Sequence, residues 1–234
     1  MSQLSSPDDG ATEPTDEAPA TDDRREALVE SLRAELGDAL VDHHIRVGDD
    51  LWVRVATDAW QEAARVARNH LRFQYFDYLS AIDWLPSPYG KNEDSPLDAK
   101  PEPDTTIVPG YAGGETRFQV LARLQGLPDP VGLTLKADVP EDDFAVDSWV
   151  TVYPGANWHE REAHEMFGIG FRGHPNLTHI YLPGAFEGHP LRKDFPLLAR
   201  HVKPWPGIVD VEPMPEEDEP AEDAEAEATE EVSS

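Results

Sequence analysis

The chain has 234 residues, with 19 Lys and Arg side chains against 47 Asp and Glu, and it contains no cysteine. The lack of cysteine excludes disulfides, thiolate metal sites, Cys-ligated iron–sulfur clusters and cysteine nucleophiles. A net charge of −28 repels phosphate backbones, so we do not expect a nucleic-acid ligand. No apolar run approaches the ~18 residues of a membrane span and no secretory signal is evident, so we expect membrane association only through partners.

The negative charge is concentrated at the two ends of the chain. Residues 1–23 hold seven acidic groups and residues 210–234 hold twelve, and neither segment contains Lys or Arg. Both segments are poor in large apolar residues and cannot bury enough surface to offset ordering entropy, so we expect disordered acidic tails. Their simplest role is solubility, and the alternative is docking onto a basic partner.

The first elements between the tails are a helix and a hairpin. Leu28, Leu32 and Leu36 recur at helical spacing before Gly37, which predicts a helix that stops at this glycine. Two alternating runs then flank a turn at residues 48–50, which predicts a β-hairpin. The inward positions of its strands are Val41, His43, Ile45, Val47, Leu51, Val53 and Val55.

A second helix and three more strands follow. Asp58 and Gln61 are spaced for a capping box at the start of a helix whose apolar positions are Trp60, Ala63, Ala64, Ala67 and Leu71. A mostly apolar strand is predicted within residues 76–84, followed by a proline-rich loop at 86–114. Alternation over 118–124 and again over 131–137 predicts the last two strands.

This order of helix, two strands, helix and three strands predicts an α+β fold, a two-layer sandwich with helices on one face of a mixed sheet. We assign residues 24–155 to this domain. Residues 156–209 form a helix followed by a long extended C-terminal arm.

Several motifs in the chain have ordinary structural interpretations. His43 and His44 point to opposite faces of a strand and cannot chelate one metal ion, and Trp52 and Trp84 are expected as core or edge aromatics. A GxGxxG pattern at residues 168–173 follows a helical stretch instead of opening a helix, which argues against dinucleotide binding. The histidines at 159 and 164 are five residues apart, whereas a zinc-protease helix needs four. A metal site built from His174, His179, His189 and His201 remains an alternative to hydrogen-bonded interface histidines.

Residues 159–165 carry ionisable groups at six of seven positions, on every side of the expected helix. Trp158 before them and Met166 and Phe167 after them predict that both helix ends are buried. Arg161 and Glu165 have the i, i+4 spacing of an ion pair. Glu160 and Glu162 are then expected to meet Arg192 and Lys193. Loss of one partner from such a buried pair would cost about 3–5 kcal/mol.

Residues 168–209 combine six glycines and six prolines with large apolar residues that need burial. A structureless stretch of this length is unusual in a compact domain. We therefore expect the arm to form an obligate protein–protein interface, of the class that covers roughly 2,000–5,000 Å².

The run WHEREAHEMFGIGFRGHPNL, followed by GHPLRKDFP, resembles the signature of the C-type or 30 kDa-type subunit of proton-translocating NADH:quinone oxidoreductase, respiratory complex I. The resemblance covers residues 24–209. Related chains occur in membrane-bound hydrogenase assemblies, which stays an alternative, as does an independent histidine-based metal enzyme. The residues His164, Glu165, His179 and 184–186 depart from the family pattern and put individual ion pairs in doubt.

The resemblance implies a structural component of the peripheral arm, at the cytoplasmic side of the bacterial cell membrane, without a catalytic site or cofactor of its own. NADH, FMN, iron–sulfur clusters and quinone are then expected in partner subunits. The main partner implied is the D-type subunit, the large hydrogenase-like chain of the quinone site, with the neighbouring cluster-bearing subunits beside it. The signature and interface positions are Trp158, Glu160, Arg161, Glu162, Gly173, His174, Pro175, Gly188, Pro190, Leu191, Arg192, Lys193, Asp194 and Phe195.

Overall fold

The computed structural model describes residues 22–86, 105–127 and 130–195. Residues 1–21 and 210–234 of the acidic tails, most of the proline-rich loop and the arm beyond residue 195 lie outside these ranges, and the expectations for them stay predictions. Asp22 and Asp23, which were predicted as part of the N-terminal tail, are described, and they cap and begin the first helix. Within the described ranges, no helix is long and apolar enough to span a membrane.

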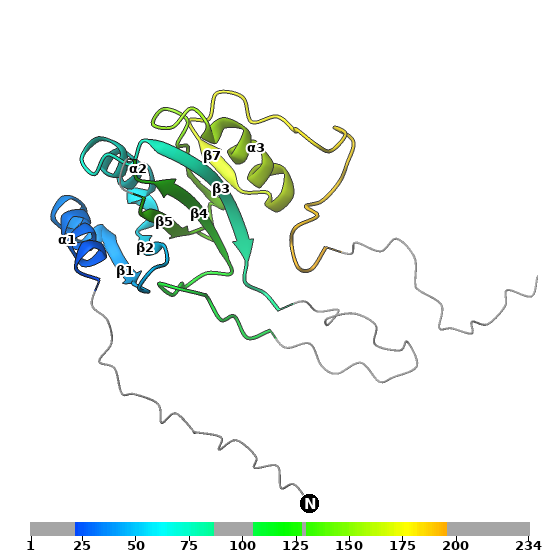
Figure 1. Ribbon diagram of the computed structural model, residues 1–234. Coiled ribbons are helices and arrows are strands. Elements are labelled where there is room, and N and C mark those ends of the chain that lie inside the picture. The colour runs from blue at the N-terminus through cyan, green and yellow to red at the C-terminus, as the bar shows by residue number, and fades with distance from the viewer. Residues whose placement is uncertain (1–21, 87–104, 128–129, 196–234) are drawn as a thin grey trace, which may run out of the picture. The chain divides into compact units, whose positions relative to one another are not determined.

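The elements follow the predicted order of helix, two strands, helix and three strands (Figure 1). Two short strands, β6 and β7, are additional, and they flank the third helix. In chain order the elements are α1 (Asp23–Leu36), β1 (Leu40–His44), β2 (Leu51–Val55), α2 (Trp60–Asn69), β3 (Tyr75–Asp83), β4 (Phe118–Gln125), β5 (Gly132–Asp138), β6 (Ala145–Asp147), α3 (Ala156–Phe167) and β7 (Gly170–Arg172).

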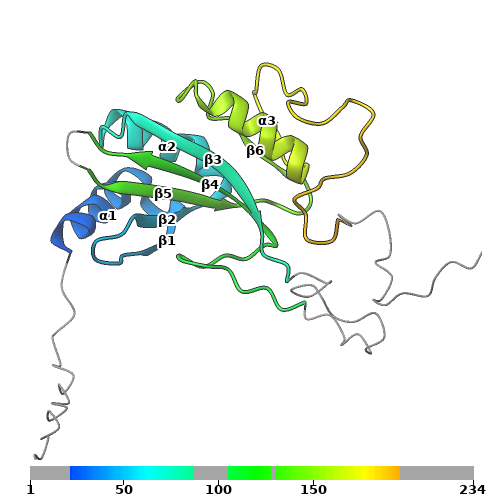
Figure 2. The same cartoon turned by 45° about the vertical axis from the view of Figure 1, so that its right-hand side comes forward.

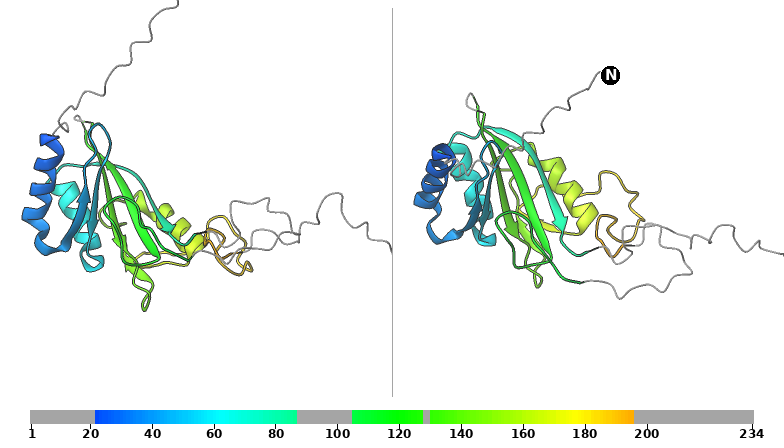
Figure 3. Two further views of the ribbon diagram at one scale, coloured as in Figure 1. Left: turned by 90° about the horizontal axis from the view of Figure 1, so that it is seen from below. Right: turned by 60° about the horizontal axis from the view of Figure 1, so that its bottom comes forward.

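Five strands form one mixed sheet in the order β1-β2-β5-β4-β3. The β2–β5 pair is parallel and the other three pairs are antiparallel, which confirms the predicted mixed sheet. Strands β6 and β7 form a separate parallel pair. Helix α3 packs against the edge strand β3, while α1 packs against α2 near the other edge (Figures 2 and 3).

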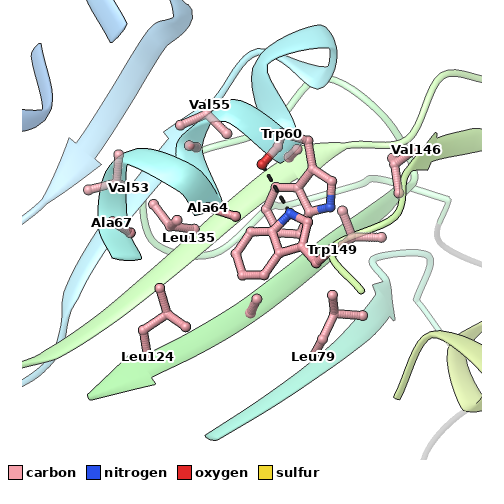
Figure 4. Close-up of a cluster of buried hydrophobic side chains, with 14 of the residues drawn as sticks. Val53, Val55, Trp60, Ala64, Ala67, Leu79, Leu124, Leu135, Val146 and Trp149 are labelled. Carbon is pink, nitrogen blue, oxygen red and sulfur yellow. Dashed lines mark hydrogen bonds between the residues drawn. The ribbon is translucent and has the colours of Figure 1, made fainter. Parts of the chain in front are cut away.

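The hydrophobic core lies on one face of this sheet, under α2. The alanines of α2 let the helix approach the sheet closely, and Val53, Leu124 and Leu135 fill the space beneath it (Figure 4). Trp60 of α2 stacks on Trp149 at 4.4 Å between ring centroids, and the Trp149 indole N–H donates to the carbonyl of Trp60 at 3.0 Å. Both tryptophans are 0% exposed, and the burial of Trp149 was not predicted because it belongs to no periodic run.

The opposite face of the sheet is polar at its centre. Asp138 accepts from Nη1 of Arg54 at 2.9 Å and from the amide of Gln119 at 2.7 Å. Gln119 in turn accepts from the indole of Trp84 at 2.8 Å, which fixes this tryptophan at the end of β3. Arg54, Gln119, Asp138 and Trp84 thus form a hydrogen-bonded network on this face, whereas the buried Lys136 amine beside them has no hydrogen-bond partner among the described residues.

The predicted inward positions of the first strand are wrong at Val41 and Val47, whereas Ile45 packs against the core. Val41 is 45% exposed and Val47 is 53% exposed, whereas Leu40 is buried. A register irregularity between Leu40 and Asp42 takes Val41 out of the alternation, and Val47 lies in the turn. His43 is opposite the buried Val53, so the positions after the irregularity keep the predicted face. The predicted inward set of the second strand, Leu51 with Val53 and Val55, is confirmed.

The predicted capping box of α2 is also wrong. The helix begins at Trp60 after a 3-10 turn (Thr57–Ala59), and no side chain caps it. Gln61 instead donates to the carbonyl of Ser148 at 2.5 Å. The first turn of the helix is therefore held by this contact with residue 148 and not by a capping side chain. The predicted buried positions Trp60, Ala63, Ala64 and Ala67 are confirmed, whereas Leu71 lies beyond the end of the helix and is only partly buried. The end of α1 before Gly37 is also confirmed.

Candidate functional site: helix α3 and its arm

The charged run predicted to be helical is α3, and Gly168 ends it. The residue has a left-handed φ of +80°, and its N–H donates to the carbonyl of His164 at 2.8 Å. A Cβ at this position would lie 2.5 Å from side-chain nitrogens of both His189 and Arg192. Glycine is therefore required here for the turn and for the close approach of the chain that returns to the helix.

The described part of the predicted arm is residues 173–195, and from here on "the arm" means these residues. They run alongside α3 (yellow to orange in Figures 1 and 2). The arm contains no regular secondary structure among these residues. Its backbone groups therefore need partners outside a ladder or helix. The charged side chains of α3 supply many of them.

Glu165 makes more hydrogen bonds to the arm than any other side chain described for α3, and it is 1% exposed. Its carboxylate accepts three backbone N–H groups, those of Ile180 at 3.0 Å, Tyr181 at 3.0 Å and Leu182 at 2.5 Å. Burial raises the pKa of this carboxyl, but the three N–H donors outweigh burial and lower it below the ordinary value. The predicted ion pair with Arg161 is wrong, because both side chains are committed to the arm.

Arg161 and Glu162 hold the same stretch of the arm from the neighbouring side. Arg161 donates to the carbonyls of Thr178 at 2.8 Å and His179 at 3.0 Å, and Glu162 accepts from the hydroxyl of Tyr181 at 3.0 Å. The two side chains are complementary, because the Glu165 carboxylate accepts from backbone N–H groups of the arm and the Arg161 guanidinium donates to its backbone carbonyls. This explains why charges occur on several sides of α3.

Glu160 faces the core instead and is 0% exposed. Its carboxylate accepts from the Ser148 hydroxyl at 2.6 Å and from the Trp149 N–H at 2.5 Å. Burial raises its pKa to about 7, against the opposing effect of these two hydrogen bonds. The expected partnership with Arg192 or Lys193 is wrong, since Glu160 binds the 148–149 segment of its own domain.

The expectation of two buried helix ends is half wrong. Phe167 at the C-terminal end is 5% exposed, but Trp158 in the first turn is 69% exposed. The small Ala156, which is fully buried, takes the inward position at that end.

Two histidines of the arm fix it to backbone carbonyls of α3. Nε2 of His174 contacts the carbonyl of Asn157 at 3.1 Å, while Nδ1 accepts from the N–H of Asn176 at 3.1 Å. This arrangement assigns the proton to Nε2, and burial lowers the pKa of His174. Nδ1 of His189 contacts the carbonyl of Glu165 at 2.8 Å.

The run Arg192 to Asp194 closes the arm onto the domain. Nε of Arg192 donates to the carbonyl of Phe167 at 2.7 Å, and its guanidinium lies 5.0 Å from the ring centre of Phe144. The backbone N–H of Lys193 donates to Asp83 at 2.8 Å. The predicted pairing of these basic side chains with the acids of α3 is therefore wrong.

Arg117 joins this end of the arm to the sheet. It donates to both carboxylate oxygens of Asp83, at 2.8 and 2.6 Å, and to Asp194 at 3.1 Å. Burial acts to raise the pKa of Asp83, but the hydrogen bonds from Arg117, Lys193 and Leu85 outweigh it and lower the pKa. Sequence reasoning missed Asp83, Arg117 and Ser148, because no motif links them to the signature. One signal existed, since Asp83 carries a charge at the end of an otherwise mostly apolar strand.

The remaining signature positions shape the arm. Gly173 and Gly188 have φ values of +81° and +97°, and a Cβ on Gly188 would lie 2.6 Å from the ring of Phe195. The Leu191 N–H donates to the carbonyl of Met166 at 3.2 Å, although its side chain is 49% exposed. Pro175 is exposed and Pro190 is half-buried.

Among the residues that the structure describes, no group of three or more His, Asp or Glu side chains is arranged to hold a metal ion. The three glycines of the GxGxxG pattern lie at the end of α3, in β7 and in the following turn. The site is therefore a helix whose charged side chains order an extended segment of the chain.

The chain is similar to a defined family. The model described as "Respiratory-chain NADH dehydrogenase, 30 Kd subunit" matches residues 53–201. A C-type NADH-quinone oxidoreductase subunit from Roseiflexus sp. (strain RS-1) is 36% identical over 177 residues, covering 75% of this chain and 86% of that protein. The chain therefore belongs to the respiratory-chain NADH dehydrogenase 30 kDa subunit family.

Two further similarities extend this result. A C/D-type NADH-quinone oxidoreductase subunit from Pseudomonas fluorescens (strain SBW25) is 35% identical over 173 residues, which cover 74% of this chain but only 28% of that longer protein. A chain of an archaeal membrane-bound sulfane sulfur reductase shares the fold, with a TM-score of 0.52 and 20% identity over 74% of this chain and 86% of that chain.

Proposed function

We propose that this chain is a cofactor-free structural component of the peripheral arm of NADH:quinone oxidoreductase and that it packs against the D-type subunit. In this role it supports electron transfer from NADH to quinone, coupled to proton translocation, without performing a chemical step. NADH, FMN, iron–sulfur clusters and quinone would bind to other subunits. The assembly would hold the chain at the cytoplasmic side of the cell membrane.

The single observation that carries this proposal is the use of the signature charges. Glu160, Arg161, Glu162 and Glu165 bind backbone or hydroxyl groups of the chain itself, and Asp194 binds Arg117. Groups committed in this way are not free to act as a general acid, a base or a metal ligand. What they produce is an ordered arm, and ordering a segment before binding lowers the entropy cost of forming an interface.

The choice of the D-type subunit is supported by the relatives of the C/D type. In these proteins a region similar to this chain and the D region belong to one polypeptide. Two proteins that occur fused in one organism commonly contact each other as separate chains in another. The named relatives are NADH-quinone oxidoreductase subunits, which favours that assembly over a hydrogenase complex.

Deletion of the gene followed by complementation tests the proposal. Membranes that lack this chain should lose quinone-linked NADH oxidation, while NADH oxidation with an artificial acceptor such as ferricyanide should persist in the separate NADH-oxidising module. Co-purification with a tagged D-type subunit should recover the chain from complemented cells. Retention of quinone-linked activity without the chain, or recovery of the chain in a stable complex that lacks the D-type subunit, would contradict the proposed role.

A further inference from the structure

A groove of about 300 Å³ lies between helix α1, the turn that follows α2 and the turn between β4 and β5. One face of α1 forms one wall, because its lining residues recur at the helical spacing i, i+3, i+4 and i+7, as Arg24, Ala27, Leu28 and Ser31. Residues 71–73 and 126–127 line the rest. The groove is largely apolar, since each of the three elements contributes a leucine, and the leucine at position 127 is 61% exposed.

The groove is basic in a chain that is strongly acidic. Its nine lining residues include two arginines, Arg24 and Arg72, and no acidic side chain, although the chain as a whole has a formal charge of −28. Positive charge beside apolar surface favours an occupant that combines carboxylates with small apolar groups. An acidic peptide segment with small apolar side chains has this chemistry.

Arg72 is held in a conformation that an arginine rarely adopts. Its φ is +63°, in the left-handed region that glycine enters without strain, and the N–H of Phe73 closes the turn by donating to the carbonyl of Ala67 at 2.9 Å. The Arg72 side chain is exposed, and within the described ranges it makes no hydrogen bond or ion pair. Strained residues of this kind cluster at sites that bind something. The arginine therefore points to a contact with a segment outside the described residues.

The segment directly before α1 has the matching chemistry. Residues 1–21 hold five acidic groups and no Lys or Arg, and they end three residues before Arg24. Glu13, Asp16 and Glu17 lie among alanines and prolines within residues 11–20. The α1 wall from residue 24 to residue 31 is about 10 Å long at 1.5 Å per residue, whereas five extended residues span about 16 Å. The chain before residue 22 is therefore long enough to turn back and lay these acids along the groove.

We infer that the N-terminal acidic tail, residues 1–21, binds this groove of its own chain, with its acids at positions 13, 16 and 17 facing the two arginines. Attachment beside the groove gives the tail an effective concentration in the millimolar range, so a weak contact suffices for substantial occupancy. The prolines of the tail reduce the entropy lost on binding. The inference goes beyond the proposed function, because it requires no other subunit. Its consequence is that the tail covers apolar surface that would otherwise be open to other proteins.

The first experiment measures access to the groove in the full chain, which has no native cysteine. Ser31→Cys introduces a thiol at an exposed position of the α1 wall. With the wild-type tail, a maleimide should label this thiol about threefold more slowly than in the triple variant Glu13→Gln, Asp16→Asn and Glu17→Gln, which corresponds to a groove about two-thirds occupied by the tail. Salt at about 1 M should remove the difference, because it screens charges beyond about 3 Å.

A matched control removes the same three charges from the other tail. Glu222→Gln, Glu225→Gln and Glu227→Gln together should leave labelling of the thiol introduced by Ser31→Cys slow. Equally fast labelling in both triple variants would show that only the overall charge acts on the thiol, and it would overturn the inference. The thiol introduced by Val47→Cys, at a position 53% exposed in the β1–β2 turn, should react at one rate in all backgrounds.

A second experiment changes the groove instead of the tail. Arg72→Asn removes the charge, and asparagine tolerates a left-handed φ, so the fold should be kept. In this variant the thiol introduced by Ser31→Cys should be labelled as fast as in the variant with the neutralised N-terminal tail. Arg46→Asn is the control, because it neutralises an arginine that is 66% exposed between β1 and β2, and labelling in this background should stay slow.

Each outcome decides the inference. Relief of slow labelling by the N-terminal tail variant and by Arg72→Asn, but by neither charge control, supports it. Fast labelling in every background would mean an open groove and would overturn it. Slow labelling that neither variant relieves would overturn it in favour of another occupant, and a dependence on protein concentration would identify that occupant as a second copy of the chain. None of these results depends on binding of the D-type subunit, so the proposed function is tested separately.

Discussion

Glu160 and Lys136 are charged residues that the fold buries without an opposite charge in direct contact. Glu160 has two neutral hydrogen-bond donors, and Lys136 lies on the polar face of the sheet, 5.5 Å from the ring centre of Trp84. Burial raises the pKa of Glu160 to about 7 and lowers the pKa of Lys136 to about 8. Both shifts favour the neutral form, so each residue should contribute a definite pH dependence to stability.

For Glu160, the folded state binds more protons than the unfolded state between pH 4.5 and about 7. Its contribution to the free energy of unfolding should therefore fall as pH rises through this window. Glu160→Gln mimics the protonated acid and should remove the fall, measured by urea unfolding at several pH values. Glu160→Ala should cost about 2–4 kcal/mol, because it leaves a cavity and an unpaired Trp149 N–H. Glu162→Gln is the control, and an unchanged pH slope in Glu160→Gln would contradict this account.

For Lys136, the direction of the pH dependence is reversed. Its amine has no hydrogen-bond partner among the described residues, and the side chain is 1% exposed. The folded pKa lies below the ordinary value of 10.5, so stability should rise as pH increases from about 8 to 10.5. Lys136→Met should abolish this rise and stabilise the protein by about 1–2 kcal/mol at pH 7, because no buried cation remains. The exposed Lys193 provides the control Lys193→Met, and a loss of stability in Lys136→Met would show that the amine is satisfied.

At the scale of elements, α3 and the arm behave as one unit because the helix supplies partners for the arm backbone. Glu165→Ala removes the acceptor of three N–H groups and should release residues 178–182. We expect faster hydrogen exchange and new proteolytic cuts in that stretch, while the sheet amides keep their protection. Glu162→Ala, which loses only one contact to the Tyr181 hydroxyl, should leave exchange in the arm nearly unchanged. Equal exchange in both variants would mean that Glu165 does not hold the arm.

The junction of the arm with the sheet depends on Arg117. The Asp83 side chain is 0% exposed, and Arg117 is its charged partner. Arg117→Ala should cost about 3–5 kcal/mol of unfolding free energy, because it strands a buried carboxylate. The double variant with Asp83→Asn should recover part of this loss, and full additivity of the two substitutions would contradict direct coupling.

Arg192→Ala should lower the free energy of unfolding by less than the about 3–5 kcal/mol expected for loss of a buried ion-pair partner. The residue donates to a backbone carbonyl and lies over two phenylalanine rings, so we expect a cost of about 1–2 kcal/mol from thermal or urea unfolding. Its functional effect should appear as reduced assembly, followed in proportion by lower quinone-linked activity. Normal complex abundance with lost electron transfer would instead indicate a direct role of Arg192 near the quinone site.

At the scale of the whole molecule, the fold and the C-terminal acidic tail have separate roles. Removal of residues 210–234 deletes twelve acidic groups and few apolar ones. We expect the truncated chain to assemble normally and to support normal quinone-linked activity, since the family match ends at residue 201. Complementation of a deletion strain over a range of salt concentrations measures both. A salt-sensitive loss of assembly would mean that the tail docks onto a basic partner.

The described fold was largely predictable because its elements carry regular periodicity. The α2 stripe and the alternation of β2, β4 and β5 each place apolar side chains on one face, and such a one-sided apolar pattern is what a local sequence encodes. The burial of the polar side chains of β5 on the other face comes from tertiary contacts. Errors arose where one residue of irregularity intervened, as at the register shift near Leu40. The small β6–β7 pair was missed because strands of three residues are too short to show a period.

The sequence by itself determined the α+β class, the position of the charged helix and the family, because periodicity and a long uninterrupted signature are local properties of the chain. Only the tertiary structure decided which groups the charged side chains meet. Lys193 and Asp83 are 110 residues apart, and Arg117 and Asp194 are 77 apart. Charge in a sequence indicates that a partner is needed but not whether the partner is an opposite charge or the backbone. In this protein the backbone of the arm is the partner of Glu165 and Arg161, because an extended segment without a ladder leaves its N–H and C=O groups unpaired.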